Sequence, residues 1–490
     1  MRLQQASNGE LLTLNEFHLL GAGGEARIYT VPGAPGLVAK VWHKPGAERS
    51  RKVRVMLSNP PADPMAAQQH VSIAWPTDLL LPAGRAEPVS GFLMPRVQGM
   101  QPIGEVSHPK TRRERSPLFS TFYLHRTARN LAIAVRALHE RGYVIGDLNE
   151  SNVLVAETAL VTIVDTDSFQ VRDDDTGTVF RCRVGKPEFT PPELQGRSFA
   201  ECDRDPVHDC FGLGVLIFQL LMEGTHPFAG LYRGRGEPPP IEARIAAGHF
   251  PYGAAPQVPF GAKPTAPAFE ALFPGLQDLF LRCFRDGHFR PELRPDPRSW
   301  QYQLEEAESH LVTCQWNSQH VYADHVEHCP WCLRTRMLGG RDPFPSIEAV
   351  RTGAHRVPPP RRGRGGRVGG HQGGRPGASL PPPAGVPLPP PIPPSKSQTG
   401  VRGKRGRPLL GDWNDWAWVA LALSGLAGAG LMPTHGRPNP IAFLLALGGL
   451  LVGILGEAKA HMPEIDGRGR WIARTAIAGG LLCLGWCLRG

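Results

Sequence analysis

One stretch of the sequence decides the fold: residues 142–155 read GYVIGDLNESNVLV. It places Asp147 five residues before Asn152 and ends in a short apolar run typical of a strand. The preceding residues 123–141 carry apolar side chains at helical spacing. The sequence therefore predicts a loop between a helix and a strand, and this loop presents one carboxylate and one amide.

A glycine-rich segment lies upstream, where residues 20–28 read LGAGGEARI, and the runs over 17–20, 26–31 and 37–42 are strand-like. Glycine lets the backbone approach a phosphate where a Cβ atom would obstruct it. Lys40 follows inside the apolar run LVAKV at residues 37–41. A lysine in such a run would ordinarily face solvent. Here it follows the glycine loop at hairpin distance, so we expect it to reach the same site.

Two further segments follow the loop in order. Residues 184–193 read VGKPEFTPPE, and residues 209–215 read DCFGLGV at the start of an apolar helix. With the glycine loop, the strand lysine, the Asp and Asn pair and a late Arg294, this order resembles the protein-kinase superfamily. The resemblance covers about 300 residues.

The resemblance implies an α+β, bilobal protein-kinase fold over residues 10–310, with a β-rich N-lobe and an α-helical C-lobe. It makes Asp147, Lys40 and Asn152 catalytic, and it implies ATP with Mg²⁺ or Mn²⁺ as cofactors. It also implies that residues 184–193 form the end of the activation segment and that Glu193 and Arg294 form a structural ion pair. The residues it assigns to nucleotide binding are Gly21, Ala22, Gly23, Gly24, Ala26, Ile28, Lys40, Glu48, Asn152, Asp165 and Asp167.

Several positions depart from the family pattern. Gly146 stands where the family has an Arg that binds a phosphorylated activation segment, so switching by phosphorylation is not expected here. Asn149 replaces a lysine that would add a cation near the transferred phosphoryl group. The resemblance implies Asn152 and Asp165 as the Mg²⁺ ligands, with Asp167 as the alternative to Asp165.

The motifs above do not include an acidic partner for Lys40. Glu48 is the only acidic residue between Lys40 and Asp63, so it is the candidate partner. It lies only eight residues beyond Lys40, which leaves little chain before a helix.

Cysteine and histidine cluster after the kinase-like region, at residues 311–335. Three thiolates and one imidazole form the ligand set of a tetrahedral structural zinc site. Such a closed site would be structural or a docking surface. The alternatives are His325 or His328 as the fourth ligand, or free cysteines beside ordinary surface histidines. The expected zinc ligands are Cys314, His320, Cys329 and Cys332.

The rest of the chain reads as a linker and a membrane region. Residues 341–407 carry 13 Lys or Arg and 2 Asp or Glu, a net +11, which accounts for the whole-chain formal charge of +10. This charge belongs to a Pro/Gly-rich tail, so we expect a disordered linker at 336–410 and no specific nucleic-acid partner.

Residues 411–490 contain apolar segments at 416–432, 441–456 and 471–488, each a candidate transmembrane helix. The third contains Arg474, which leaves an interfacial helix as its alternative. Lys and Arg flank the segments so that the N-terminus faces the cytoplasm and the C-terminus lies outside. The sequence thus predicts a multi-pass protein of the cytoplasmic membrane in contact with its lipids.

Together these features predict a membrane-tethered, ATP-dependent kinase acting on Ser or Thr of protein substrates. The alternatives are a pseudokinase scaffold that binds nucleotide or partner proteins, and a small-molecule kinase. The GGEA loop, the DTDSF segment at 165–169 and the Cys/His cluster resemble a bacterial kinase-like group often linked to PP2C-type phosphatases. That resemblance implies a phosphatase partner.

Overall fold

A computed structural model describes residues 1–253 and 257–356 of the chain. No helix within these ranges combines the length and hydropathy needed to cross a membrane. The three predicted transmembrane segments and most of the predicted linker lie outside the described residues, so those predictions stand as they were made.

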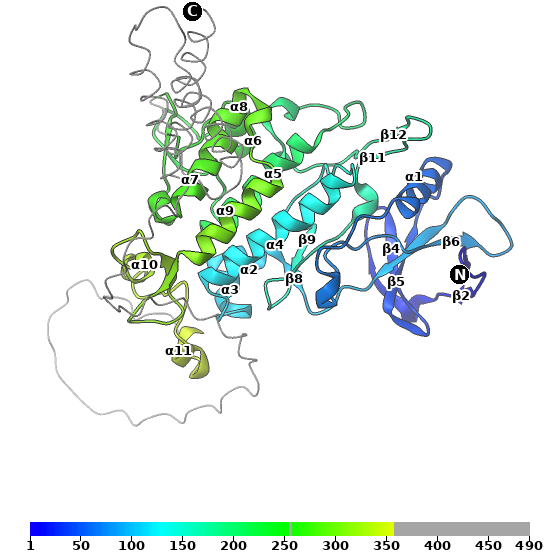
Figure 1. Cartoon of the computed structure of the whole chain (residues 1–490), viewed down its shortest axis with the longest axis horizontal. Coiled ribbons are helices and arrows are strands. Elements are labelled where there is room, and N and C mark those ends of the chain that lie inside the picture. Colours follow the sequence, from blue (N-terminus) through cyan, green and yellow to red (C-terminus); the bar gives the residue numbers. More distant parts are fainter. Residues whose placement is uncertain (254–256, 357–490) are drawn as a thin grey trace, which may run out of the picture. The chain divides into compact units, whose positions relative to one another are not determined.

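The N-terminal part is a seven-stranded antiparallel sheet with the strand order β2-β1-β6-β7-β5-β4-β3. Helix α1 (Ala47–Ser58) accompanies the sheet (Figure 1). The strands are β1 (Arg2–Gln5), β2 (Leu11–Thr13), β3 (Leu19–Ala22), β4 (Ala26–Val31), β5 (Ala34–Trp42), β6 (Asp78–Pro82) and β7 (Gly91–Pro95).

The sheet begins earlier than the predicted domain start at residue 10, because β1 pairs with both β2 and β6. The predicted strand over 17–20 begins only at Leu19. The reason is local: Asn15 caps a 3-10 turn over Glu16–His18 by accepting a bond from the Phe17 amide. The predicted strands over 26–31 and 37–42 are confirmed within β4 and β5.

The second part is helical and is organised around α4 (Thr121–Glu140), α5 (Pro206–Leu221) and α9 (Pro297–Ser309) (Figure 1). The apolar side chains of α4 that show helical spacing in the sequence are all buried: Leu124, Leu131, Val135 and Leu138. The α4 and α9 helices are joined by Arg126, whose guanidinium donates to both oxygens of Glu308. The predicted helical lobe is confirmed.

The helix starts follow capping rules. Asp205 precedes α5 and forms a capping box with His208, and Pro206 occupies the first helical position. Asp296 caps α9 by accepting a bond from the Ser299 amide at 2.7 Å. The remaining helices are α2 (Ile103–Ser107), α3 (Pro109–Arg115), α6 (Ile241–Ala246), α7 (Pro274–Leu281), α8 (Gly287–Phe289), α10 (Pro330–Met337) and α11 (Ile347–Arg351).

Short strands frame the loops of the helical part. The stretch of residues 142–155 ends in β9, which pairs with β10. After the Cys/His cluster, the ordered structure continues past the predicted end at residue 335 through α10 and α11. These strands are β8 (Gln101–Pro102), β9 (Val153–Val155), β10 (Val161–Ile163), β11 (Val171–Arg172), β12 (Val179–Phe180), β13 (Leu231–Tyr232), β14 (Phe260–Gly261), β15 (Leu311–Thr313) and β16 (Val321–Ala323).

Candidate active site

A cavity of about 530 Å³ lies between the sheet and the helical part. Its sheet side includes the predicted loop and strand residues Gly23, Gly24, Ala26, Ile28 and Lys40. Its other side includes Asp147, Asp165 and Asp167. The predicted residues Gly21 and Ala22 lie on exposed positions of β3 and are not among the lining residues.

Lys40 is buried in β5 and extends from the sheet to two carboxylates. Its ammonium lies 2.5 Å from Asp165 Oδ1 and contacts Asp167 Oδ1 as well. Burial disfavours the charged ammonium, but the two carboxylates outweigh it and raise the pKa of Lys40. Lys40 is therefore a permanent cation at the centre of the cleft.

The two aspartates have different surroundings. The Asp167 side chain is 13% exposed, and Trp42 Nε1 donates to its second oxygen at 3.0 Å. The Asp165 side chain is 43% exposed, and its backbone has a φ of 60°, a conformation that L residues seldom adopt. Asp167 thus has both oxygens engaged, whereas Asp165 faces the open cavity.

Glu48 does not reach Lys40 in the structure. It lies in the first turn of α1, lines the cavity, and accepts bonds from Arg183 at 2.8 and 3.0 Å. The expected Lys40–Glu48 pair is therefore not formed, and Asp167 takes that place.

Lys52 is a cleft residue that the sequence did not reveal. It extends from α1 and donates to the backbone oxygen of Asp167 at 2.7 Å. Its side chain keeps some solvent exposure, but it lies deep among protein atoms, and this desolvation lowers its pKa to about 8 despite the nearby Asp167. The cleft therefore holds a second lysine that titrates near neutral pH.

Asp147 is held by the amides around it. Asn149 Nδ2 donates to Asp147 Oδ1 at 2.7 Å, and Asn152 Nδ2 donates to Oδ2 at 3.2 Å. Burial raises the pKa of Asp147, while these bonds and the nearby Lys186 oppose the rise. Because Asn152 uses its nitrogen here, its oxygen remains available as a metal ligand.

The loop that carries Asp147 is held in place by Asp209 on α5. The Asp209 carboxylate accepts bonds from the Ile145 amide at 2.7 Å and the Gly146 amide at 2.8 Å. Gly146 has a φ of +75°, and a Cβ atom there would lie 2.7 Å from Nη1 of Arg204. Only glycine fits this position, which explains the departure from the family pattern.

Glu193 and Arg294 form the ion pair that the resemblance implies. The two guanidinium nitrogens donate to the two carboxylate oxygens at 2.6 and 2.7 Å, and the Arg294 side chain is fully buried. This prediction is confirmed. The fork geometry ties the end of the activation segment to the region before α9.

The predicted zinc ligands meet in space. The ligand atoms of Cys314, His320, Cys329 and Cys332 all lie within 4.8 Å of one another. His320 turns Nδ1 toward the thiols, 3.4 Å from Cys332 Sγ, and hydrogen-bonds Asp342 through Nε2 at 2.9 Å. A carboxylate behind a ligating histidine is typical of metal sites.

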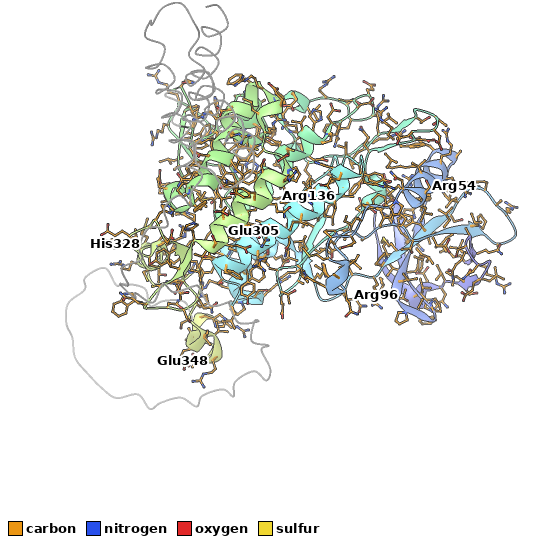
Figure 2. The ribbon with its side chains drawn as sticks, viewed as in Figure 1. Arg54, Arg96, Arg136, Glu305, His328 and Glu348 are labelled. Carbon is orange, nitrogen blue, oxygen red and sulfur yellow. The ribbon has the colours of Figure 1, made fainter. Side chains whose placement is uncertain are left out.

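The alternative histidines lie elsewhere. His325 Nε2 hydrogen-bonds the backbone oxygen of Glu270 at 3.0 Å. His328 is exposed, and Figure 2 shows it at the outer edge of this module. Burial opposes ionisation of Cys314, but the backbone N–H groups of Trp316 and Asn317 outweigh it and lower its pKa to about 7.

Local spacing predicted Asp147, Asn152, Lys40 and the Cys/His cluster, but not their supports. Lys52, Trp42 and Asp342 were missed because they act across long sequence separations. Lys52 lies in the middle of a helix that also carries Arg49, Arg51 and Arg54, so the sequence made it look like one more solvent-facing charge. The one available signal for Asp342 was that it is an acid close beyond the Cys/His cluster.

This architecture, a sheet and a helical lobe with a lysine, an Asp and Asn loop and paired aspartates between them, resembles that of a protein kinase. In sequence, the chain is similar to curated protein kinases. It is 35% identical over 331 residues to the protein kinase YegI of Escherichia coli strain K12, covering 66% of this chain and 49% of that protein. It is also 35% identical to the protein of the same name from Escherichia coli O157:H7, covering 64% and 48%.

The chain spans about half the length of these curated relatives. A solved structure of the ROP18 kinase domain in complex with AMP-PNP and sucrose aligns with a TM-score of 0.40 and 18% identity, covering 62% of this chain and 83% of that one. No family model matches the sequence.

Proposed function

We propose that this protein is an ATP-dependent protein kinase that phosphorylates Ser or Thr hydroxyls of protein substrates. The observation that carries the proposal is the convergence of Lys40, Asp165 and Asp147 on one cavity beneath the glycine loop. Phosphoryl transfer depends chiefly on positioning and charge stabilisation, and these groups supply both. The names of the curated relatives support the same activity.

Each group has a distinct role in this proposal. The backbone at Gly23 and Gly24 would lie against the phosphates of ATP, and Lys40 would pair with their oxygens. Asp165 and the Asn152 oxygen would hold Mg²⁺, which neutralises phosphate charge when bound. Asp167 holds Lys40 in place, and Asp147 accepts the proton of the attacking hydroxyl.

The test uses the full-length chain with Mg²⁺, labelled ATP and a generic protein substrate. We expect label on Ser or Thr and a loss of about 10²–10⁴-fold in kcat for Asp147→Asn, the range of general-base catalysis. The control is Lys110→Ala, an exposed lysine on α3.

Three results would count against parts of this proposal. Binding of ATP without transfer by the wild type would identify a pseudokinase scaffold, which the altered loop at Gly146 and Asn149 makes the second candidate. Label only on tyrosine would overturn the Ser/Thr assignment. Unchanged transfer by Asp147→Asn would remove Asp147 from the mechanism.

We further propose that Cys314, His320, Cys329 and Cys332 hold a structural Zn²⁺. Their number and chemistry fit a closed tetrahedral site, and Asp342 orients the imidazole. Purified full-length chain should contain about one zinc per molecule, as expected of a structural site. Cys332→Ser should lose it, whereas Cys202→Ser, a buried cysteine outside the cluster, should keep it. Zinc retained by Cys332→Ser would contradict the assignment.

The apolar segments at 416–432, 441–456 and 471–488 support a proposal of membrane tethering with the kinase domain in the cytoplasm. Lipid contact and a PP2C-type phosphatase partner belong to the same proposal. Membrane fractionation with protease protection tests the topology: recovery in the soluble fraction would overturn it. Failure of a PP2C-type phosphatase to bind or dephosphorylate the chain would remove that partner.

A further inference from the structure

The catalytic loop lacks a cation where the family pattern provides one. Position 149 is Asn149, which is 1% exposed and donates to Asp147 Oδ1 at 2.7 Å and to the Asp147 backbone oxygen at 3.0 Å. An amide in this place can orient the aspartate but carries no charge. The transferred phosphoryl group would therefore meet one positive charge fewer on this side of the cleft.

A lysine from another segment stands beside this gap. Lys186 lies in the activation segment, just before the 3-10 turn Pro187–Phe189. Its Nζ lies 2.9 Å from Glu150 Oε1 and 2.6 Å from Ser151 Oγ, so the ammonium is fixed against the catalytic loop. Both of these partners lie within four residues of Asp147.

Lys186 also acts on Asp147 itself. Its backbone N–H and its ammonium both favour the ionised form of the Asp147 carboxylate. The ammonium has three donors, and Glu150 and Ser151 take two of them in the described part of the chain. The side chain is 38% exposed, so the third donor can meet a ligand that enters from solvent.

The other two lysines of the cleft contact the aspartate pair Asp165 and Asp167. Lys40 is bound to Asp165 and Asp167, and Lys52 donates to the Asp167 backbone oxygen. Both lie at the aspartate pair rather than at the Asp147 side. Among these three lysines, Lys186 is thus the one fixed against the catalytic loop beside Asp147.

We propose that Lys186 supplies the cation missing at position 149 and stabilises the phosphoryl group in transit. The inference rests on the proposed kinase function. In the step, the bond between the γ-phosphorus and its bridging oxygen breaks, and the electron pair stays on ADP. The substrate oxygen bonds to the phosphorus, and its proton passes to Asp147.

The test compares steady-state kinetics of the full-length wild type with Lys186→Ala and Lys186→Met, the second of which keeps an apolar stem. Removing one group that stabilises developing charge costs about 10²–10³-fold in kcat. We expect that loss with little change in KM for ATP, because the contact strengthens only in the transition state. Lys186→Arg should retain most activity, and Lys110→Ala should behave as wild type.

A rescue variant separates chemistry from structure. The double variant Asn149→Lys/Lys186→Ala moves the charge to the position where the family has it. Its kcat should be at least tenfold higher than that of Lys186→Ala, although the bonds to Glu150 and Ser151 are not restored. The inference is overturned if Lys186→Met keeps wild-type kcat. It is also overturned if Lys186→Ala and Lys186→Met lose both melting temperature and kcat relative to the wild type, and the double variant restores neither quantity. A wild type that transfers no phosphate overturns the proposed function, and this inference with it.

Discussion

At the residue scale, the ionisation of Asp147 sets the first prediction. Burial raises its pKa above the ordinary value of 3.8, and the ionised form is the one that can accept a proton. Activity should therefore rise with pH through this raised pKa. Asn149→Ala removes a bond to the ionised carboxylate, so the acid limb of kcat/KM should move upward by about one pH unit, equivalent to about 1.4 kcal/mol.

The measurement is a pH profile of kcat/KM for wild type and Asn149→Ala, with Lys110→Ala as control. An acid limb at the same pH in all three would show that the amide does not tune Asp147. A shift toward lower pH would contradict the sign of the argument.

Lys52 gives a prediction on the alkaline side. Its pKa is lowered to about 8, so its ammonium is present below that pH and is lost above it. ATP affinity should fall about tenfold between about pH 7 and about pH 9, equivalent to about 1.4 kcal/mol. Lys52→Arg should flatten this dependence, because an arginine stays charged.

Titration with a fluorescent ATP analogue at several pH values provides the measurement. Lys44→Arg, at an exposed position beyond β5, is the matched control and should keep the wild-type dependence. An identical pH slope in Lys52→Arg would show that another group is responsible.

The same residues show what a sequence can and cannot supply. Asp147 and Asn152 were predictable because five residues of loop fix their relationship. The partner of Lys40 was not, because Asp165 and Asp167 lie 125 and 127 residues away and only the folded chain brings them close. The ambiguity between the two aspartates has the same cause: their spacing in the sequence is similar, and only the folded chain shows that they differ in exposure, backbone conformation and bonding.

At the scale of elements, the strands and helices were predictable wherever hydrophobic periodicity was strong, as in α4 and β5. The sheet was larger than expected because β1 and β2 are short and mix polar with apolar residues. The conformation of the activation segment could not be predicted from hydrophobic periodicity, because individual side-chain contacts order this segment.

Arg204 is the side chain that orders this segment, and it gives the third prediction. It is 3% exposed, lies 3.9 Å from the Phe199 ring centroid, and donates to the backbone oxygens of Gly146 and, at 2.7 Å, Val184. Arg204→Ala should leave these carbonyls unpaired and cost about 1–3 kcal/mol of unfolding free energy. It should also lower kcat at least tenfold.

The measurements are urea unfolding, kcat and limited proteolysis within residues 168–192. Arg197→Ala, at an exposed position of the same region, should change none of them. Protease resistance equal to the wild type in Arg204→Ala would show that the segment is ordered by other contacts. Because Arg204 of the protein itself orders the activation segment, this segment of the wild type should stay ordered without phosphorylation.

At the scale of the whole folded part, the Cys/His module is joined to the helical lobe by a buried ion triad. The Glu223 carboxylate accepts bonds from Arg112 at 2.7 Å and Arg334 at 2.6 Å. Arg334 lies on α10, two residues after Cys332. Arg112 lies on α3 and stacks over Phe344 at 4.4 Å. The module is therefore packed as part of the helical lobe.

This connection gives the last prediction, which rests on the zinc proposal. Glu223→Gln leaves two buried guanidinium groups without their counter-charge, and breaking a buried pair in this way costs about 3–5 kcal/mol of unfolding free energy. Because α10 begins within the cluster at Pro330, loosening Arg334 should also loosen the metal ligands. Zinc should leave Glu223→Gln at least tenfold faster in a chelator than it leaves the wild type. Glu292→Gln, at an exposed position outside the triad, should match the wild type in both measurements. Equal release rates in all three proteins, with only the unfolding free energy reduced, would mean that the metal cluster and the helical lobe are energetically independent.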